Sequence, residues 1–365
     1  MAFDPQREDY QRLGLRYARH IDATNPADAT RAFATFGRRF ARERDSLPQS
    51  DGDRAFHLVA MASKLIDYEL PFVSDEEAEN LIVRGHQLLD EALSLDGRCY
   101  DALRMKAAAD NPSFEAFYTY LTDCAEEVRR ICEERRASAL ATEPSDERKQ
   151  LAADIAMRPF LRWLATLAEQ ALICGRNREA LRHARAALEV DLRDGADVRF
   201  TAALAYAKLE DEQGLDELLS GALAKRCTRP SNDAWAQIAR VAMAHKRYDL
   251  RAASEQLGEL MRLYPHAPET LIRQIELPDG VFARLAVRPY SEDELVLAVS
   301  EATVLLQEGR EPEGRGVLGV WVQREAARAL TPAVLQTLVT QAQMASRDAD
   351  ASGGTSTPKE SGDSQ

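Results

Sequence analysis

The chain has 365 residues, of which 45% are hydrophobic and 29% charged, and its formal net charge is −13. This composition is that of a protein with an apolar core and excludes a disordered or collagen-like chain. The acidic balance argues against non-specific binding of nucleic acid, because such binding depends on Lys and Arg side chains that neutralise phosphates.

The first residues, MAFDPQREDYQRLG, lack the basic region, apolar stretch and cleavage site of a secretory signal. No run approaches the ~18 consecutive apolar residues that a membrane span needs. The five cysteines form no Cys-x-x-Cys pair and lie in apolar-periodic segments. We therefore expect free, buried thiols, a cytoplasmic protein and no membrane partner. Only seven residues are Lys, and Ala and Asp are abundant, which indicates a GC-rich bacterial genome.

Apolar residues recur at the helical spacing from about Ala27 to about Ser346, and strand-like alternation is nearly absent. This pattern predicts an all-α protein. Capping residues mark where helices should begin, since their side chains satisfy the first free backbone N–H groups. The predicted caps are Asp28, Ser74 with Glu77, Ser145, Asn232 or Asp233, Ser291 with Glu294, and Thr331 followed by Pro332.

Loop-forming stretches divide the chain into four regions. A helical N-terminal region covers 1–141, with a degenerate repeat near 80–110, and TEPSDER (142–148) should join it to repeats over 142–275. C-terminal helices follow over 276–346. The tail over 347–365 has no aliphatic residue larger than Ala and is expected to be disordered. Pro159 should kink or divide the long helix that follows Ser145.

The stretch LATLAEQALICGRNREALRHARAAL (164–188) predicts two amphipathic helices folded against each other across Gly175. Such a pair cannot bury its apolar face alone, so it implies stacked neighbours. Small residues stand where the two helices should touch, namely Ala168, Ala171, Ala180, Ala184 and Ala187.

Together with Leu164 and Leu167, these alanines resemble the tetratricopeptide (TPR) repeat, a helix–turn–helix of 34 residues. Fainter copies lie at 86–107 and 248–269. Leu192 stands where the repeat usually has a proline, which the 248–269 copy keeps as Pro265. The resemblance implies a TPR-like α-α superhelix with a helical N-terminal extension.

A second likeness covers about 80–325 and is similar to poorly characterised bacterial TPR-like proteins related in pattern to the suppression-of-tumorigenicity family. It implies no reaction. Gly195 and Asp197 depart from that pattern. The matching positions are Asp191, Asp194, Val198, Arg199 and Phe200, then Pro265, Pro268, Leu271, Leu277, Pro278 and Glu292.

The spacing of the candidate residues does not fit known catalytic, cofactor-binding or metal-binding motifs, so we expect no catalytic, cofactor or metal site. Asp191, Asp194 and Asp197 are three apart, whereas calcium loops place ligands at alternate positions. We expect the first two to close one helix and Asp197 to stand at the start of the next. The six histidines are scattered, and GREPEGRG (309–316) lacks the Lys-Ser/Thr of a phosphate loop.

Two groups of side chains leave alternatives open. The Arg residues at 38–44 and 129–136 alternate with acids, which favours solvated helix faces over contact with RNA or another anion. The aromatic cluster Phe114, Phe117, Tyr118 and Tyr120 covers much of one helix, so its members either pack in the core or anchor a partner.

These observations predict a non-catalytic scaffold or adaptor that binds a protein or peptide in a concave groove. The groove walls should be the first helices around 159–173, 199–208 and 232–246, and the candidate contact residues are Arg162, Arg199, Tyr206 and Arg240. The alternatives are a helical-repeat regulator that contacts nucleic acid, and a helical enzyme without a recognisable motif.

Overall fold

The computed structural model describes residues 4–19, 26–70, 73–222, 224–227, 229–277, 287–309, 315–338 and 340. Over these residues the regular structure is helical and includes no β-strand, which confirms the all-α prediction. No helix among them is both long enough and apolar enough to cross a membrane. The tail predicted at 347–365 lies outside the described residues.

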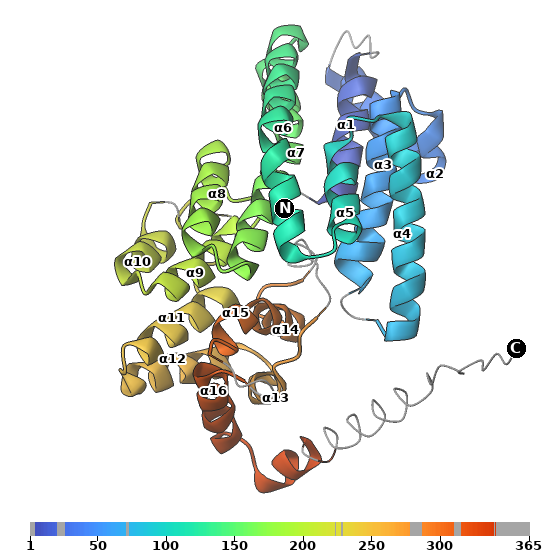
Figure 1. The fold of residues 1–365 in the computed structure, drawn as a ribbon. Coiled ribbons are helices and arrows are strands. Elements are labelled where there is room, and N and C mark those ends of the chain that lie inside the picture. The colour runs from blue at the N-terminus through green and yellow to red at the C-terminus, as the bar shows by residue number, and fades with distance from the viewer. Residues whose placement is uncertain are drawn as a thin grey trace, which may run out of the picture.

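The N-terminal helices form a bundle on one side of a long central hairpin (Figure 1). Their apolar side chains form two small clusters. One cluster lies between the first two helices around Leu13 and Phe36, and the other includes Val59, Leu89 and Ala102. The elements are α1 (Pro5–Arg19), α2 (Pro26–Glu43), η1 (Arg44–Ser46), α3 (Asp51–Ser63), the π-helical turn η2 (Lys64–Glu69), α4 (Asp75–Leu95) and α5 (Tyr100–Asp110).

The central hairpin consists of α6 (Phe114–Thr142) and α7 (Asp146–Ile173), which pack along each other. Ser145 caps α7, as predicted, by accepting a hydrogen bond from the Arg148 N–H at 3.4 Å. Trp163 of α7 donates its indole N–H to the Leu121 carbonyl of α6 at 2.8 Å. The turn falls beside the division predicted at 141/142, and the main apolar core continues across it from Tyr100 to Ala326.

Of the two outcomes predicted for Pro159, a kink or a division of the helix, the division does not occur, because α7 runs through Pro159 as one helix of 28 residues. Every residue of α7 from Met157 to Leu172 is buried. The helix packs against α1, α5 and α6 and against two helices that follow it in the chain. Packing on several sides offsets the hydrogen bond that the proline removes.

The predicted hairpin between α7 and α8 (Asn177–Val190) is confirmed. Gly175 adopts a positive φ of 72°, and the Arg176 N–H donates to the Ala171 carbonyl at 2.7 Å, which closes the end of α7. The five alanines expected at the helix contact are all buried. Their small side chains let the two backbones approach.

Two further hairpins continue the stack beyond α8 (Figure 1). They are α9 (Val198–Leu209) with α10 (Glu212–Ser220), and α11 (Ala234–Lys246) with α12 (Leu250–Leu263). The first helix of each pair contacts the first helix of the next, since α9 packs on both α7 and α11. Gly214 is needed for the close approach of α9 and α10, because a Cβ there would lie 2.2 Å from the Tyr206 ring.

The acidic turn between α8 and α9 agrees with the prediction at Asp191, which ends α8, and at Asp197, which stands at the start of α9, and differs from it at Asp194. Asp194 does not close α8: its carboxylate accepts hydrogen bonds from the backbone N–H groups of Val198 at 2.8 Å and Arg199 at 3.1 Å, and so caps α9. Asp197 precedes α9 with a positive φ of 53°, and its side chain does not cap the helix. The positive φ turns the chain so that the earlier aspartate reaches the helix N-terminus.

The C-terminal segments fold back onto this stack. α14 packs on α11, α15 packs on α9, and α16 packs on α13. Asp233 and Ser291 cap α11 and α14, as predicted, by accepting from the N–H groups of Ala236 and Glu294. The bounds are α13 (Ala267–Arg273), α14 (Glu292–Glu301), α15 (Thr303–Leu306) and α16 (Val317–Arg328).

The cysteines are free, as expected. Cys99 and Cys132 are buried, and Cys124, Cys174 and Cys227 are half-buried. Burial raises the pKa of both Cys99 and Cys132 to about 11, so these thiols stay protonated and unreactive at neutral pH.

The close contact of α7 and α8 can be tested by overfilling it. We expect Ala184→Leu to lower the free energy of unfolding by about 1–3 kcal/mol, because Ala184 is fully buried and the added atoms have no space. Ala137→Leu on the exposed face of α6 is the matched control and should change it by less than about 0.5 kcal/mol. Urea unfolding followed by circular dichroism measures both, and equal effects would contradict the packing described.

Candidate functional site

Arg162 of α7 joins three helices through a buried network of ion pairs. Its Nε and Nη2 donate to the two carboxylate oxygens of Asp101 on α5 at 2.6 and 2.7 Å. Its Nη1 donates to Glu8 of α1 at 2.9 Å. The Arg162 residue is 4% exposed and both acids are buried. This candidate contact residue therefore binds the protein's own carboxylates, and its guanidinium is not available at a surface.

Two further arginines share the Glu8 carboxylate. Arg12 donates to it at 2.7 Å, and Arg158 lies 3.4 Å from it. Burial by itself raises the pKa of Glu8, but the guanidinium groups of Arg162, Arg12 and Arg158 outweigh it and lower this pKa to about 2. Glu8 is thus ionised at neutral pH, and its charge holds α1 against α7.

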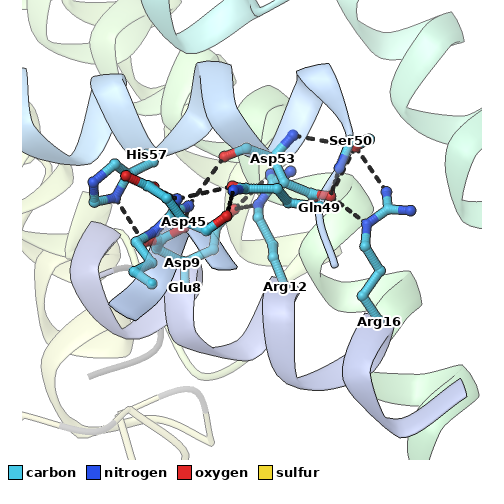
Figure 2. A network of polar contacts seen from close by, with 10 residues as sticks. Glu8, Asp9, Arg12, Arg16, Asp45, Gln49, Ser50, Asp53 and His57 are labelled. Carbon is cyan, nitrogen blue, oxygen red and sulfur yellow. Dashed lines mark hydrogen bonds and ion pairs between the residues drawn. The ribbon is translucent and has the colours of Figure 1, made fainter. Parts of the chain in front are cut away.

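A second line of polar contacts joins α1 to α3 and η1 (Figure 2). Asp9 accepts from Nε of Arg44 at 2.7 Å and lies 2.8 Å from Nδ1 of His57. Burial raises the pKa of Asp9, and the hydrogen bonds from Arg44 and His57 reverse this and lower it. Arg16 pairs with Asp53, the capping-box residue of α3.

A histidine held by a carboxylate is the arrangement of a general base. His57 and Asp9 line a hollow of about 640 Å³ between α1, α2, α3 and α4. Among the described residues that line this hollow, none is Ser, Thr or Cys. Arg44 also occupies the carboxylate. We therefore assign these contacts to the attachment of α1.

Arg199 lies at the centre of another buried network. Its Nη2 donates to Asp233 of α11 at 2.8 Å and to the Pro230 carbonyl at 3.0 Å, and Arg199 is 1% exposed. Arg229 lies beside it, 3.2 Å from Asp197 and 3.6 Å from Glu294 of α14. Like Arg162, this candidate is a structural residue: it joins α9 to α11 in the interior.

The other two candidate contact residues are Tyr206 on α9 and Arg240 on α11. Tyr206 is buried, and its hydroxyl accepts a hydrogen bond from Arg185 of α8 at 2.9 Å. Arg240 is half-buried and lines a hollow of about 610 Å³ between α10, α11 and α12. Thus the structure does not bring the four candidates together, and only Arg240 keeps an open face.

The face predicted as the groove, on α7, α9 and α11, is partly covered by the chain's own α14 and α15 (Figure 1). Lys208 of α9 donates to the Val304 carbonyl at 3.0 Å. Lys208 and Lys246 of α11 also hold the Glu308 carboxylate, at 3.1 and 2.7 Å. Burial raises the pKa of Glu308, but the two ammonium groups outweigh it and lower the pKa. Lysines from α9 and α11, the first helices of two successive hairpins, thus both pair with the Glu308 side chain.

A hollow of about 270 Å³ remains where α14 and α15 meet α7 and α9. Its floor is apolar, and three carboxylate side chains lie around it. The aromatic cluster is now divided: Phe117 and Tyr118 are buried in the core, whereas Phe114 is 55% exposed at the hollow. The lining residues are Phe114, Glu169, Leu172, Ile173, Thr201, Leu204, Glu276, Leu277, Leu297, Ser300, Glu301, Thr303 and Val304.

The pairing of Lys208 and Lys246 with Glu308 was not predicted from the sequence. A signal was present: in a chain with only seven lysines, one stands near the end of each of two successive first helices. The spacing gave no sign that a carboxylate from residue 308 would reach both.

No protein-family model, curated protein or solved structure matches this chain. Within the described ranges, no three His, Cys, Asp or Glu side chains are grouped so that they could hold a metal ion. The site is therefore interpreted from its own geometry: a small apolar hollow with an acidic border, next to a segment held by two lysines.

The role of Arg162 is testable by removing its charge. Arg162→Met should lower the free energy of unfolding by about 3–5 kcal/mol, because it leaves Glu8 and Asp101 buried without their shared partner. Arg182→Met, which breaks an exposed pair with Glu179, is the control and should cost at most about 1 kcal/mol. Guanidinium unfolding of both variants measures this, and a small loss for Arg162→Met would refute the structural role.

Glu8 should also make stability depend on pH. Its folded pKa is about 2, below the ordinary 4.5, so its stabilising effect is complete above pH 4.5 and is lost as pH falls toward 2. The advantage of the wild type over Glu8→Gln should therefore shrink in this window, by at most about 1.4 kcal/mol per pH unit. Urea unfolding at pH 6, 4 and 3 measures it. An advantage that stays constant with pH would contradict this assignment.

Proposed function

We propose that this protein is a TPR-like α-α superhelix that binds a peptide or protein segment, without catalysis, in the cytoplasm. The stacking of α7–α8, α9–α10 and α11–α12 supports the repeat description, because the first helices of consecutive pairs contact one another. In such a stack the first helices line a shared concave face.

The observation that carries this proposal is how α14 and α15 lie on that face. Helical segments from later in the chain pack against α9 and α11 and are tied down by the two lysines on Glu308. A surface that accepts one helical segment in this way is suited to a second one beside it. The hollow lined by Thr303 and Leu204 is the part of the face that α14 and α15 leave open.

Two arginines of the 129–136 cluster, which was considered for RNA contact, favour the same proposal. Arg129 donates to Glu126 and Glu133 on its own helix, and Arg130 donates to Glu134. Exposed pairs of this kind belong to a solvated helix face, and their charge is balanced locally. A continuous basic strip would have been needed to favour nucleic acid.

The test is a selection of twelve-residue peptides from a displayed library against the full chain. Peptides that bind the hollow should lose at least tenfold in affinity for Thr303→Trp, because the indole would fill the space. Thr119→Trp, the same change at an exposed position of α6, should leave binding unchanged. If no selected peptide distinguishes Thr303→Trp from Thr119→Trp, the hollow is not a peptide site and the proposal fails.

A further inference from the structure

A recess between α1 and the hairpin of α6 and α7 carries a charge that is unusual for this chain. It has a volume of about 360 Å³ and lies between the second half of α1, the end of α6 and the first half of α7. Of the described residues that line it, four are Arg, one is Asp and none is Glu or Lys. In a chain with a net charge of −13, this is a local concentration of positive charge. The arginines that define this arginine recess are Arg12, Arg16, Arg19 and Arg135.

Helical spacing places three of these arginines on one face of α1. Arg12, Arg16 and Arg19 are four and three positions apart, so their side chains follow one another along the helix. Arg12 and Arg16 extend from α1 in the same direction (Figure 2). Arg135 comes from α6 and lines the recess from the hairpin. Guanidinium groups from two separate elements thus border one small volume.

The carboxylates that pair with the arginines of α1 are less exposed than the arginines themselves. Arg16 pairs with Asp53, and Nε of Arg19 donates to Glu143 at 2.9 Å. Both acids are buried, whereas the side chains of Arg16 and Arg19 are 34% and 46% exposed. The positive end of each pair is therefore the end that meets solvent. An anion that enters the recess approaches guanidinium groups before it approaches carboxylates.

These arginines keep N–H groups that their ion pairs do not use. A guanidinium has five N–H donors in a fixed plane. The hydrogen bonds of Arg16 and Arg19 run from Nε and Nη2, and within the described part of the chain their Nη1 groups make none. Nη2 of Arg135 lies 3.9 Å from Asp96, which is too far for a hydrogen bond. An anion can therefore bind here without displacing an ion pair that stabilises the fold.

The size and the remaining walls of the recess suit a small organic molecule. Its volume of about 360 Å³ falls in the range of roughly 300–1,000 Å³ that is usual for small-molecule sites. Leu15 of α1 and Ile155 and Pro159 of α7 give it an apolar wall. Ser138 of α6, which is exposed, adds a hydroxyl group. A ligand with an anionic group and an apolar part matches both kinds of wall.

The number of arginines favours a phosphate group over a carboxylate. A phosphate monoester carries a charge of about −1.5 to −2 at neutral pH and has three strong acceptor oxygens. A carboxylate has one charge and two oxygens, which a single guanidinium can satisfy through two parallel hydrogen bonds. Guanidinium groups on both sides of the recess can each donate to a different phosphate oxygen.

We propose that the arginine recess binds a small organic phosphate ester. The phosphate group lies among Arg16, Arg19 and Arg135, and the organic part lies on Leu15 and Ile155. This inference goes beyond the peptide binding proposed above and does not depend on it, because the recess and the hollow at Thr303 have no lining residue in common.

Calorimetric titration of the full chain with butyl phosphate tests this inference. Butyl phosphate should bind about tenfold more tightly than butyrate, because it has more charge and one more acceptor oxygen. Arg135→Gln should weaken the binding of butyl phosphate about fivefold or more, and the fold should persist because the side chain is exposed and makes no hydrogen bond. Arg136→Gln, at the next exposed arginine of α6 and outside the recess, is the matched control and should leave the affinity unchanged.

A second pair of variants changes the charge of the recess at Ser138. Ser138→Glu should weaken the binding of butyl phosphate about tenfold or more, because it adds a negative charge at the recess. Ser138→Gln has nearly the same size without the charge and should bind within about threefold of the wild type. Ser138 is exposed, so both variants should keep the circular dichroism spectrum of the wild type.

Four results would overturn the inference. The first is equal affinity of Arg135→Gln and Arg136→Gln for butyl phosphate, and the second is equal affinity of the two Ser138 variants. The third is equal binding of butyl phosphate and butyrate, which would show no preference for phosphate. The fourth is a phosphoserine peptide that binds through Arg135 about tenfold more tightly than butyl phosphate, which would assign the recess to a phosphorylated protein. Each of these results leaves the test with Thr303→Trp unaffected.

Discussion

The buried contact of Arg162 with Glu8 and Asp101 is the interaction on which the arrangement of the helices depends. The apolar side chains of α1 serve a separate cluster with α2, around Leu13 and Phe36, so little apolar surface joins α1 to the main core. Ion pairs between buried charged side chains hold α1 against α5 and α7 instead. Buried ions are costly to leave unpaired, so only an arrangement that brings α1, α5 and α7 into register satisfies all three side chains.

A second network of buried ion pairs joins helices in the stack in the same way. Arg199 joins α9 to α11 through Asp233, and Arg229 connects the turn before α9 to Glu294 on α14. The aromatic rings of Phe200 and Trp235 stack beside it with centroids 4.2 Å apart. This network, with the lysine pair on Glu308, keeps α14 against α11 and α15 against α9. The border of the hollow is therefore built from elements that buried charges hold in place.

Helix α7 contributes residues both to the buried ion-pair network and to the hollow. Arg162 and Glu169 lie on this helix two turns apart, one fixed in the buried network and the other at the hollow. Likewise, the Trp235 side chain that packs on Phe200 also orients Glu301. The charge and the shape of the hollow thus follow from the same contacts that stabilise the fold.

The sequence alone determined the features that depend on near neighbours. The helices, the caps at Ser145, Asp233 and Ser291, and the turn at Gly175 were predictable because periodicity and capping involve residues only a few positions apart. Two of the three segments expected as groove walls, 159–173 and 199–208, contribute residues to the hollow, and the groove itself stays a prediction. Only the tertiary structure decided which arginines are buried, that α7 continues through Pro159, and that α14 and α15 pack on α11 and α9. Arg162 meets Asp101 and Glu8 across 61 and 154 residues of chain, and packing between distant segments, which no local pattern encodes, sets such contacts.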